Sequence, residues 1–201
     1  MDIANTRVLF VDLQYDFTRK MGKEFKPRPS VGFIREMVLP FLMDQRVEVA
    51  VIISDYRQPR PGDRGDCCHP GEWGYTSEIP DNLKRSWVWV KCMNSPIWTR
   101  RPAWNQKKEP EVPHAAPEGF SEWTKNVLGT GTTVVLMGLT LDCCVLCTTQ
   151  ELNWRGYTVK ILREGTDVYS GSKDDKEWIL SHPPITNWAE PISWRSFKAL
   201  F

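Results

Sequence analysis

Short apolar runs alternate with amphipathic stretches along this chain. Runs of this length, bounded by polar or turn residues, are typical of strands that are buried on both faces of a sheet. The strands predicted in this way are Arg7–Val11, Val47–Ile53, Ser86–Val90, Val134–Met137 and Thr158–Leu162. A sixth strand and a surface arm rich in tryptophan are expected in the tail, residues 183–201.

Between these strands, apolar residues recur at helical spacing. A set at i, i+3, i+4 and i+7 predicts the buried face of a helix that Gly156 would end, and it comprises Val145, Thr148, Thr149 and Leu152. The other predicted helices are Ser30–Gln45 with a kink at Pro40, Ser121–Leu128 and Lys173–Ser181. Because strands alternate with helices, we expect right-handed crossovers and an α/β fold with a parallel sheet covered on both faces.

The length favours one domain over residues 1–201. Residues 99–119 carry several prolines and no helical period. An irregular segment of this length in a compact domain usually serves as a lid or an interface, which is the role expected for this loop.

Composition narrows the possible functions. Lysine plus arginine total 26 and aspartate plus glutamate total 25, and these charges are interleaved, so we expect neither a nucleic acid nor a membrane partner. No apolar stretch approaches the roughly 20 residues of a membrane helix, and the first residues do not read as a secretion signal. The six cysteines include adjacent pairs, which do not resemble a disulfide framework, and a cytoplasmic location is expected. The ten tryptophans are interpreted mainly as packing residues.

Three of the predicted strands end on a residue with useful chemistry. Asp12 follows the first strand, Lys91 follows Ser86–Val90, and Cys143 and Cys144 follow the strand that starts at Val134. The carboxyl ends of parallel strands meet at one edge of a sheet, so a carboxylate, an ammonium and a thiol could share one crevice. A thiol at the start of a helix is also expected to favour its thiolate form.

Each of these residues also has a purely structural interpretation. An aspartate at a strand end often only caps a turn, and a lysine there can extend to solvent. The two cysteines could simply be buried thiols, and Cys144 with Cys147 forms a C-x-x-C pair that could be a redox or metal motif. No second half of a metal motif accompanies that pair.

Three segments together resemble the isochorismatase-like cysteine hydrolase superfamily, which contains nicotinamidases, N-carbamoylsarcosine amidohydrolases and isochorismatases. They are VDLQYDF from Val11, VKCMNSPIW from Val90 and GLTLDCCV from Gly138. The resemblance implies a three-layer, doubly wound, mostly parallel six-stranded sheet with order 3-2-1-4-5-6.

The same resemblance implies a function. It suggests cleavage of an amide or carbamoyl C–N bond of a small molecule through a thioester, without a cofactor. Asp12, Lys91 and Cys144 would be catalytic, with Cys144 rather than Cys143 as the nucleophile because it directly precedes the valine of the pattern. The backbone N–H groups of Thr140 and Cys144 would form an oxyanion hole after a cis peptide at Leu139–Thr140, and a homo-oligomer is expected.

The resemblance also suggests substrate contacts. Gln14 and Phe17 come from the first motif, Trp98 follows the second, and Trp73 lies in GEWGYTSEI, which resembles a pocket-lining segment of the family. Glu72 replaces a threonine that is usual in that segment, so the details of substrate binding stay open.

Metal binding distinguishes members of this superfamily. Nicotinamidase-like members hold a divalent metal through an Asp-x-His pair, whereas this chain has Asp55-Tyr56-Arg57. Arginine has no lone pair for a metal, and a salt bridge between Asp55 and Arg57 is the expected alternative. A zinc site at Cys67, Cys68 and His69 is conceivable, but adjacent cysteines have poor chelating spacing. We therefore expect no functional metal.

Two other functions stay open at this point. Isochorismatase-like hydrolysis of a vinyl ether would use Asp12 as an acid and would not need the thiol. A catalytically silent binding or assembly protein could use the same scaffold, with the loop and the tryptophan-rich tail as its interaction surfaces.

Overall fold

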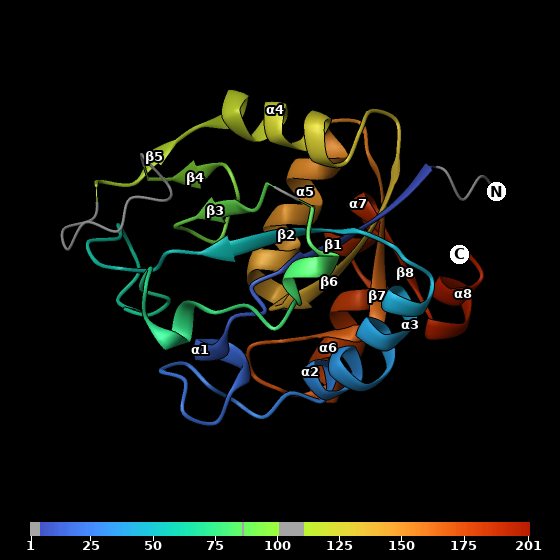
Figure 1. Ribbon diagram of the computed structural model, residues 1–201, viewed down its shortest axis with the longest axis horizontal. Coiled ribbons are helices and arrows are strands. Elements are labelled where there is room, and N and C mark those ends of the chain that lie inside the picture. The colour runs from blue at the N-terminus through green and yellow to red at the C-terminus, as the bar shows by residue number, and fades with distance from the viewer. Residues whose placement is uncertain (1–4, 86, 101–110) are drawn as a thin grey trace.

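A computed structural model describes residues 5–85, 87–100 and 111–201 of the chain. At its centre lies a six-stranded sheet of order β3-β2-β1-β6-β7-β8, with every neighbouring pair parallel (Figure 1). The strands are β1 (Thr6–Val11), β2 (Val49–Ser54), β3 (Trp89–Lys91), β6 (Thr133–Leu139), β7 (Thr158–Asp167) and β8 (Ala189–Ile192). Numbered along the chain, these six strands have the predicted order 3-2-1-4-5-6, so the predicted sheet is confirmed.

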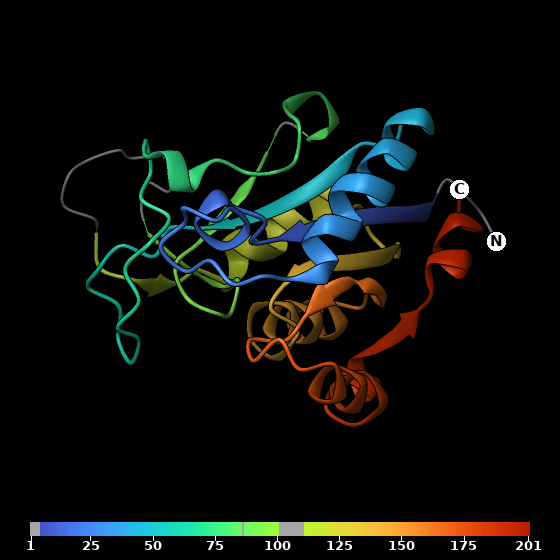
Figure 2. The same cartoon turned by 90° about the horizontal axis from the view of Figure 1, so that it is seen from below.

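Alternation along the strands divides the core into two layers. Leu9 and Val11 of β1 face one side, together with residues of α4 (Pro117–Val127), α5 (Leu146–Trp154), α6 (Lys173–Ser181) and α7 (Ile185–Trp188). Val8 and Phe10 face the other side, which is covered by α2 (Pro29–Phe33), a π-helical turn η2 (Ile34–Val38), α3 (Leu39–Asp44) and α8 (Trp194–Lys198). Helices therefore cover both faces of the sheet, as predicted (Figures 1 and 2).

The predicted helices are present with shifted boundaries. Ser30–Gln45 corresponds to α2, η2 and α3, which follow one another without a break, and the π-helical turn directly precedes the helix that contains Pro40. Proline has no N–H to donate within a helix, and a widened turn tolerates that loss. Lys173–Ser181 is matched by α6. The buried face predicted for the cysteine helix is confirmed, since its four members are buried.

The described part of the 99–119 segment is not an irregular loop, and the helix after it starts earlier than predicted. The part of the 99–119 loop within the structure's described ranges forms a small antiparallel pair, β4 (Trp98–Thr99) with β5 (His114–Ala115), and α4 starts at Pro117 rather than Ser121. Proline is favoured in the first helical turn, where its missing N–H costs nothing. The remainder of that loop, 101–110, and Ser86 of the third predicted strand lie outside the described residues.

The tail is not a surface arm. After β8, α8 folds back on the sheet with Phe197 fully buried, and Trp194 and Phe197 pack edge-on against Phe41 of α3. Burying several aromatic rings outweighs the entropy lost by ordering the tail. In the described ranges, no helix is both long and apolar enough to cross a membrane.

The remaining short elements follow β1 and β2 along the chain. α1 (Tyr15–Thr18) follows β1, and two 3-10 turns, η3 (Trp73–Tyr75) and η4 (Asp81–Leu83), lie between β2 and β3. In Figure 1, β2 points toward the left, where α1 and the chain after β2 gather. This edge is where the sequence places its candidate catalytic residues.

Candidate active site

Asp12 is held in a tight turn at the end of β1. Its φ is 53°, its N–H donates to the Ile52 carbonyl at 3.0 Å, and only 2% of the residue is exposed. The adjacent strand end is Gly138, at φ 132°, where a Cβ atom would lie 2.0 Å from the Val11 carbonyl oxygen. The close approach of β1 and β6 at this point therefore requires glycine.

Lys91 ends β3 and is fully buried. Its Nζ lies 2.8 Å from Oδ2 of Asp12 and donates to Oγ of Ser54 at 2.9 Å, while the Ser54 hydroxyl donates to Oδ1 of Asp12 at 2.7 Å. Burial lowers the pKa of Lys91, but the negative charges of Asp12 and of an ionised Cys144 outweigh it, so the net pKa is raised. Lys91 is therefore an ammonium at any physiological pH.

Cys144 lies in the first turn after β6, a π-helical turn, η5 (Leu141–Val145), that runs into α5. Its Sγ accepts from Nζ of Lys91 at 3.2 Å, lies 3.1 Å from the hydroxyl of Tyr56, and is 3.5 Å from Oδ1 of Asn94. The strand ends thus bring the carboxylate, the ammonium and the thiol of Asp12, Lys91 and Cys144 together, as predicted.

The ionisation state predicted for Cys144 is wrong. Burial raises its pKa to about 12; the Lys91 ammonium lowers the pKa without cancelling that effect, and the Asp12 carboxylate raises it further. Removal from water outweighs the position at the start of a helix. Cys144 therefore rests as a thiol, and a base must remove its proton for it to react.

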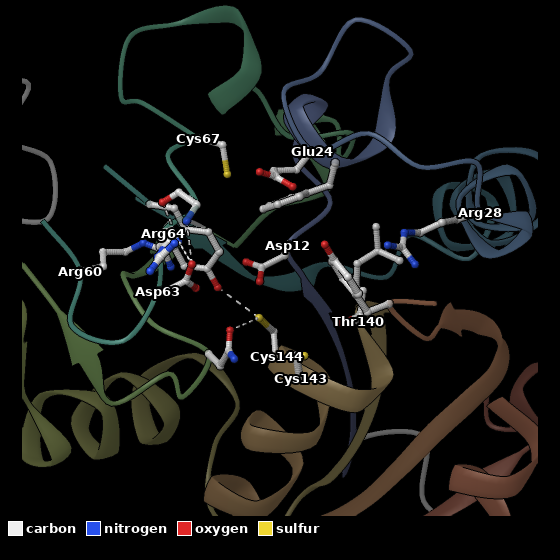
Figure 3. A pocket seen from close by; sticks show the side chains of 16 residues that line it. Asp12, Glu24, Arg28, Arg60, Asp63, Arg64, Cys67, Thr140, Cys143 and Cys144 are labelled. Carbon is white, nitrogen blue, oxygen red and sulfur yellow. Dashed lines mark hydrogen bonds and ion pairs between the residues drawn. The ribbon is translucent and has the colours of Figure 1, made fainter. Parts of the chain in front are cut away.

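A cavity of about 370 Å³ opens beside these groups (Figure 3). Asp12, Cys143, Cys144 and Thr140 line it, as does the predicted substrate contact Phe17. Several charged residues complete the lining: Glu24, Arg28, Arg60, Asp63 and Arg64. The cavity has the size of a small-molecule site and a charged rim.

The backbone at the end of β6 has the cis peptide that the resemblance implied. The Leu139–Thr140 peptide is cis, and the Thr140 carbonyl accepts hydrogen bonds from the N–H groups of Cys143 and Val145, which flank Cys144. Thr140 itself lines the cavity, so its backbone lies beside the nucleophile.

Three predicted substrate contacts lie elsewhere. Gln14 is fully buried and its amide pairs with both backbone groups of Ser54, donating at 2.9 Å and accepting at 2.7 Å, so it positions Ser54 rather than a ligand. Trp73 is half-exposed and packs on Tyr15, and Trp98 lies on β4. In the described part of the chain, none of these three lines the cavity.

The sequence analysis missed several groups of the site. Ser54 ends β2 and Tyr56 follows it, and both reach the Asp12, Lys91 and Cys144 cluster. The sequence could have indicated both residues, because β2 is predicted beside β1 in a parallel sheet and its carboxyl end must lie at the same edge. Asn94 and Arg60 come from loops with no pattern that identifies them.

The metal position of the superfamily does not fit a metal here. Both carboxylate oxygens of Asp55 accept from Arg57, at 2.8 and 2.6 Å, which confirms the predicted salt bridge. The Arg57 guanidinium thus occupies the space of a metal and already pairs with the Asp55 carboxylate that would bind it.

The alternative zinc site also lacks suitable ligands. Among the described residues, Asp16, Cys67 and Cys68 cluster closely enough to hold an ion, but the Asp16 oxygens already accept the N–H groups of Lys23 and Cys68. Burial raises the pKa of Cys68 well above its usual value, so the thiol stays protonated. His69 instead pairs with Asp66 at 2.8 Å. The prediction that no metal functions here stays a prediction.

Comparison with known proteins identifies the fold. No family model matches the chain, and no curated protein matches it. Solved structures match along nearly its whole length, among them an isochorismatase-like hydrolase from Alkaliphilus metalliredigens, with 17% identity, a TM-score of 0.66, and coverage of 98% of this chain and 97% of that one. The chain has the isochorismatase-like hydrolase fold.

Two further structures with this fold show its range. N-carbamoylsarcosine amidase from Thermoplasma acidophilum matches with 18% identity and a TM-score of 0.60, over 94% of this chain and 96% of that one. Pyrazinamidase of Pyrococcus horikoshii, solved in complex with zinc, matches with 14% identity and a TM-score of 0.62, over 94% and 99%. At identities this low, the structural matches establish the shared isochorismatase-like fold alone, and function has to be argued from the site.

Proposed function

We propose that this chain is a hydrolase that cleaves an amide or carbamoyl C–N bond of a small molecule through a thioester on Cys144. The observation that carries the proposal is the position of one buried ammonium. Nζ of Lys91 lies 2.8 Å from the Asp12 carboxylate and 3.2 Å from Sγ of Cys144, beside a small-molecule cavity. A purely structural ion pair would not need the thiol at its other side.

In the first step, Asp12 acts as the general base. The thiol proton moves to its carboxylate, and the sulfur attacks the substrate carbonyl carbon, so a C–S bond forms as the C–O π pair moves to oxygen. A base is required because Cys144 rests as a thiol. Lys91 balances the negative charge that passes from the carboxylate to the sulfur and then to the substrate.

In the second step, the C–N bond breaks. The protonated Asp12 gives its proton to the leaving nitrogen, which departs as an amine or ammonia, and the thioester remains. Asp12, again a carboxylate, then takes a proton from a water molecule that attacks the thioester. As the C–S bond breaks and the acid is released, Asp12 returns this proton to the sulfur, which restores the thiol and the carboxylate. We propose that the backbone N–H groups of Thr140 and Cys144 stabilise the oxyanion of both tetrahedral intermediates.

The reaction as proposed uses no metal, since the Asp55–Arg57 pair and the backbone-bonded Asp16 leave no suitable ligand set among the residues that the structure describes. A reducing, cytoplasmic setting suits a free catalytic thiol, and all six cysteines are free. We further propose a homo-oligomer, which size-exclusion chromatography with light scattering would test; a monomer would refute it.

The direct test measures ammonia release from primary amides, carbamoyl compounds and nicotinamide by the wild type, Cys144→Ala and Cys143→Ala. We expect release by the wild type and by Cys143→Ala, and none by Cys144→Ala. Activity that survives in Cys144→Ala would favour vinyl ether hydrolysis, in which Asp12 acts alone. No release from any compound by the wild type or either variant would favour a silent binding protein.

A further inference from the structure

Tyr56 is in contact with both Lys91 and Cys144. Its hydroxyl lies 2.5 Å from Nζ of Lys91 and 3.1 Å from Sγ of Cys144, and only 6% of the residue is exposed. Tyr56 also lines the cavity and follows the strand next to β1. Neither the superfamily resemblance nor the three-residue mechanism gives it a role.

The direction of its hydrogen bonds follows from counting protons. An ammonium only donates, so the Tyr56 oxygen accepts from Lys91 and its own proton is left to donate. The nearest acceptor for that proton is Sγ of Cys144 at 3.1 Å, and the Met93 carbonyl is more distant at 3.5 Å.

Lys91 cannot serve every neighbour by itself. An ammonium has three protons, and Nζ lies within hydrogen-bond distance of Asp12, Ser54, Tyr56, the Met93 carbonyl and Sγ of Cys144. A second donor beside the sulfur, the Tyr56 hydroxyl, can therefore stabilise the thiolate when it forms. The Tyr56 hydroxyl thus links the Lys91 ammonium to the sulfur through two hydrogen bonds.

We infer that Tyr56 is a fourth catalytic group, whose phenol donates a hydrogen bond to the Cys144 thiolate as Asp12 removes the thiol proton. The inference rests on the proposed function in taking Cys144 as the nucleophile. Burial, with the negative charges of Cys144 and Asp12, raises the pKa of Tyr56 well above its usual value, so the phenol keeps its proton throughout. A hydrogen bond to a charged sulfur is about twice as strong as a neutral one, so it favours the ionised state over the resting thiol.

The ring is held in place by contacts that do not involve its hydroxyl. The guanidinium of Arg60 lies 4.0 Å from the centre of the Tyr56 ring, and Phe17 packs edge-on at 6.1 Å between centres. Replacement by phenylalanine keeps these contacts and removes only the donor. The charged groups that face the phenol and the sulfur, Lys91, Asp12 and Arg60, all remain.

The experiment compares Tyr56→Phe with the wild type and with Tyr157→Phe, a buried tyrosine before the amino end of β7. Mass spectrometry follows iodoacetamide alkylation of Cys144 across pH, with Cys143 in the same sample as an internal standard. Below the pKa of Cys144 the rate follows the thiolate fraction, so we expect alkylation of Cys144 about 10-fold slower or more in Tyr56→Phe. In Tyr157→Phe, we expect the ratio of the Cys144 alkylation rate to the Cys143 alkylation rate to equal that of the wild type.

Kinetics with a hydrolysed amide provide the second readout. Loss of a bond made in the transition state should lower kcat about 10- to 100-fold with little change in KM. Equal Cys144 alkylation in Tyr56→Phe and wild type would overturn the inference. If Tyr56→Phe does not fold, 3-fluorotyrosine at this position, a stronger donor, should speed alkylation, and slower or equal alkylation would overturn it.

The two proposals fail differently. Hydrolysis that persists in Cys144→Ala would defeat the proposed function, while the alkylation comparison would still decide whether Tyr56 stabilises the thiolate. Hydrolysis that needs Cys144 but is unchanged in Tyr56→Phe would defeat only the role of Tyr56.

Discussion

Replacement of Lys91 by methionine removes the charge of the site and keeps a side chain of similar length. Lys91 is fully buried, and its Nζ is 3.2 Å from Sγ of Cys144. With an effective dielectric constant of about 20, an ammonium and a thiolate at that distance attract by roughly 5 kcal/mol. We therefore expect the ionised fraction of Cys144 to fall by roughly four powers of ten in Lys91→Met.

The same change should also cost stability. It leaves the Asp12 carboxylate, which is 2% exposed, without its cation, and breaking a buried pair in this way costs roughly 3–5 kcal/mol. The double variant Asp12→Asn with Lys91→Met should recover part of that loss, because neither side chain is then charged.

The assay has two parts that do not depend on the substrate. Urea unfolding gives the free energy of unfolding, and iodoacetamide alkylation of Cys144 gives the thiolate fraction. Lys84→Met is the control, since Lys84 pairs with the exposed Asp81 at the surface and should change neither. Alkylation of Cys144 in Lys91→Met at the wild-type rate would refute the assignment of Lys91 as the cation of the site.

Further predictions test other parts of the structure. Burial raises the pKa of Cys144 from 9.0, the value of a free thiol, to about 12 in the folded chain. A raised pKa favours the folded state below pH 9, so stability should fall as pH rises from about 9 to 12, and urea unfolding of Cys144→Ala should lack that part of the fall. Gly138→Ala would place a Cβ 2.0 Å from the Val11 carbonyl oxygen and should lower the free energy of unfolding by roughly several kcal/mol. In the control Gly32→Ala, within α2, no atom lies within 4 Å of the added Cβ, and stability should rise by about 0.5–1 kcal/mol. Dialysis against a chelator should leave ammonia release unchanged, and activity that falls and returns with zinc would contradict metal-independent hydrolysis.

Much of the fold could be predicted from the sequence because its signals are local. A buried parallel strand must be apolar throughout, so β1, β2 and β6 are visible as apolar runs, and the helix after Cys144 shows its buried face through its spacing. The order of the strands came from the resemblance of the motifs, not from periodicity. The predicted Lys173–Ser181 agrees with α6 to the residue, and in the structure Ser172 caps this helix and acidic residues lie in its first turn.

The tail and the pocket could not be read in the same way. α8 folds back because the Phe41 ring of α3 is available to it, and nothing within residues 183–201 indicates that surface. Trp73 and Trp98 were assigned to the pocket because their segments resemble pocket segments of the superfamily, but the side of a turn on which a ring lies depends on the elements packed against it.

By itself, the sequence determined the kinds of groups at the strand ends and the edge of the sheet where Asp12, Lys91 and Cys144 meet, because parallel strands share the direction of their carboxyl ends. Only the tertiary structure decided the state of those groups. Burial makes Cys144 a thiol where the helix start alone predicted a thiolate, and the end of β2 adds Ser54 and Tyr56 to the cluster. Distance and exclusion of water set ionisation and hydrogen bonding, and both arise only when segments far apart in the chain pack together.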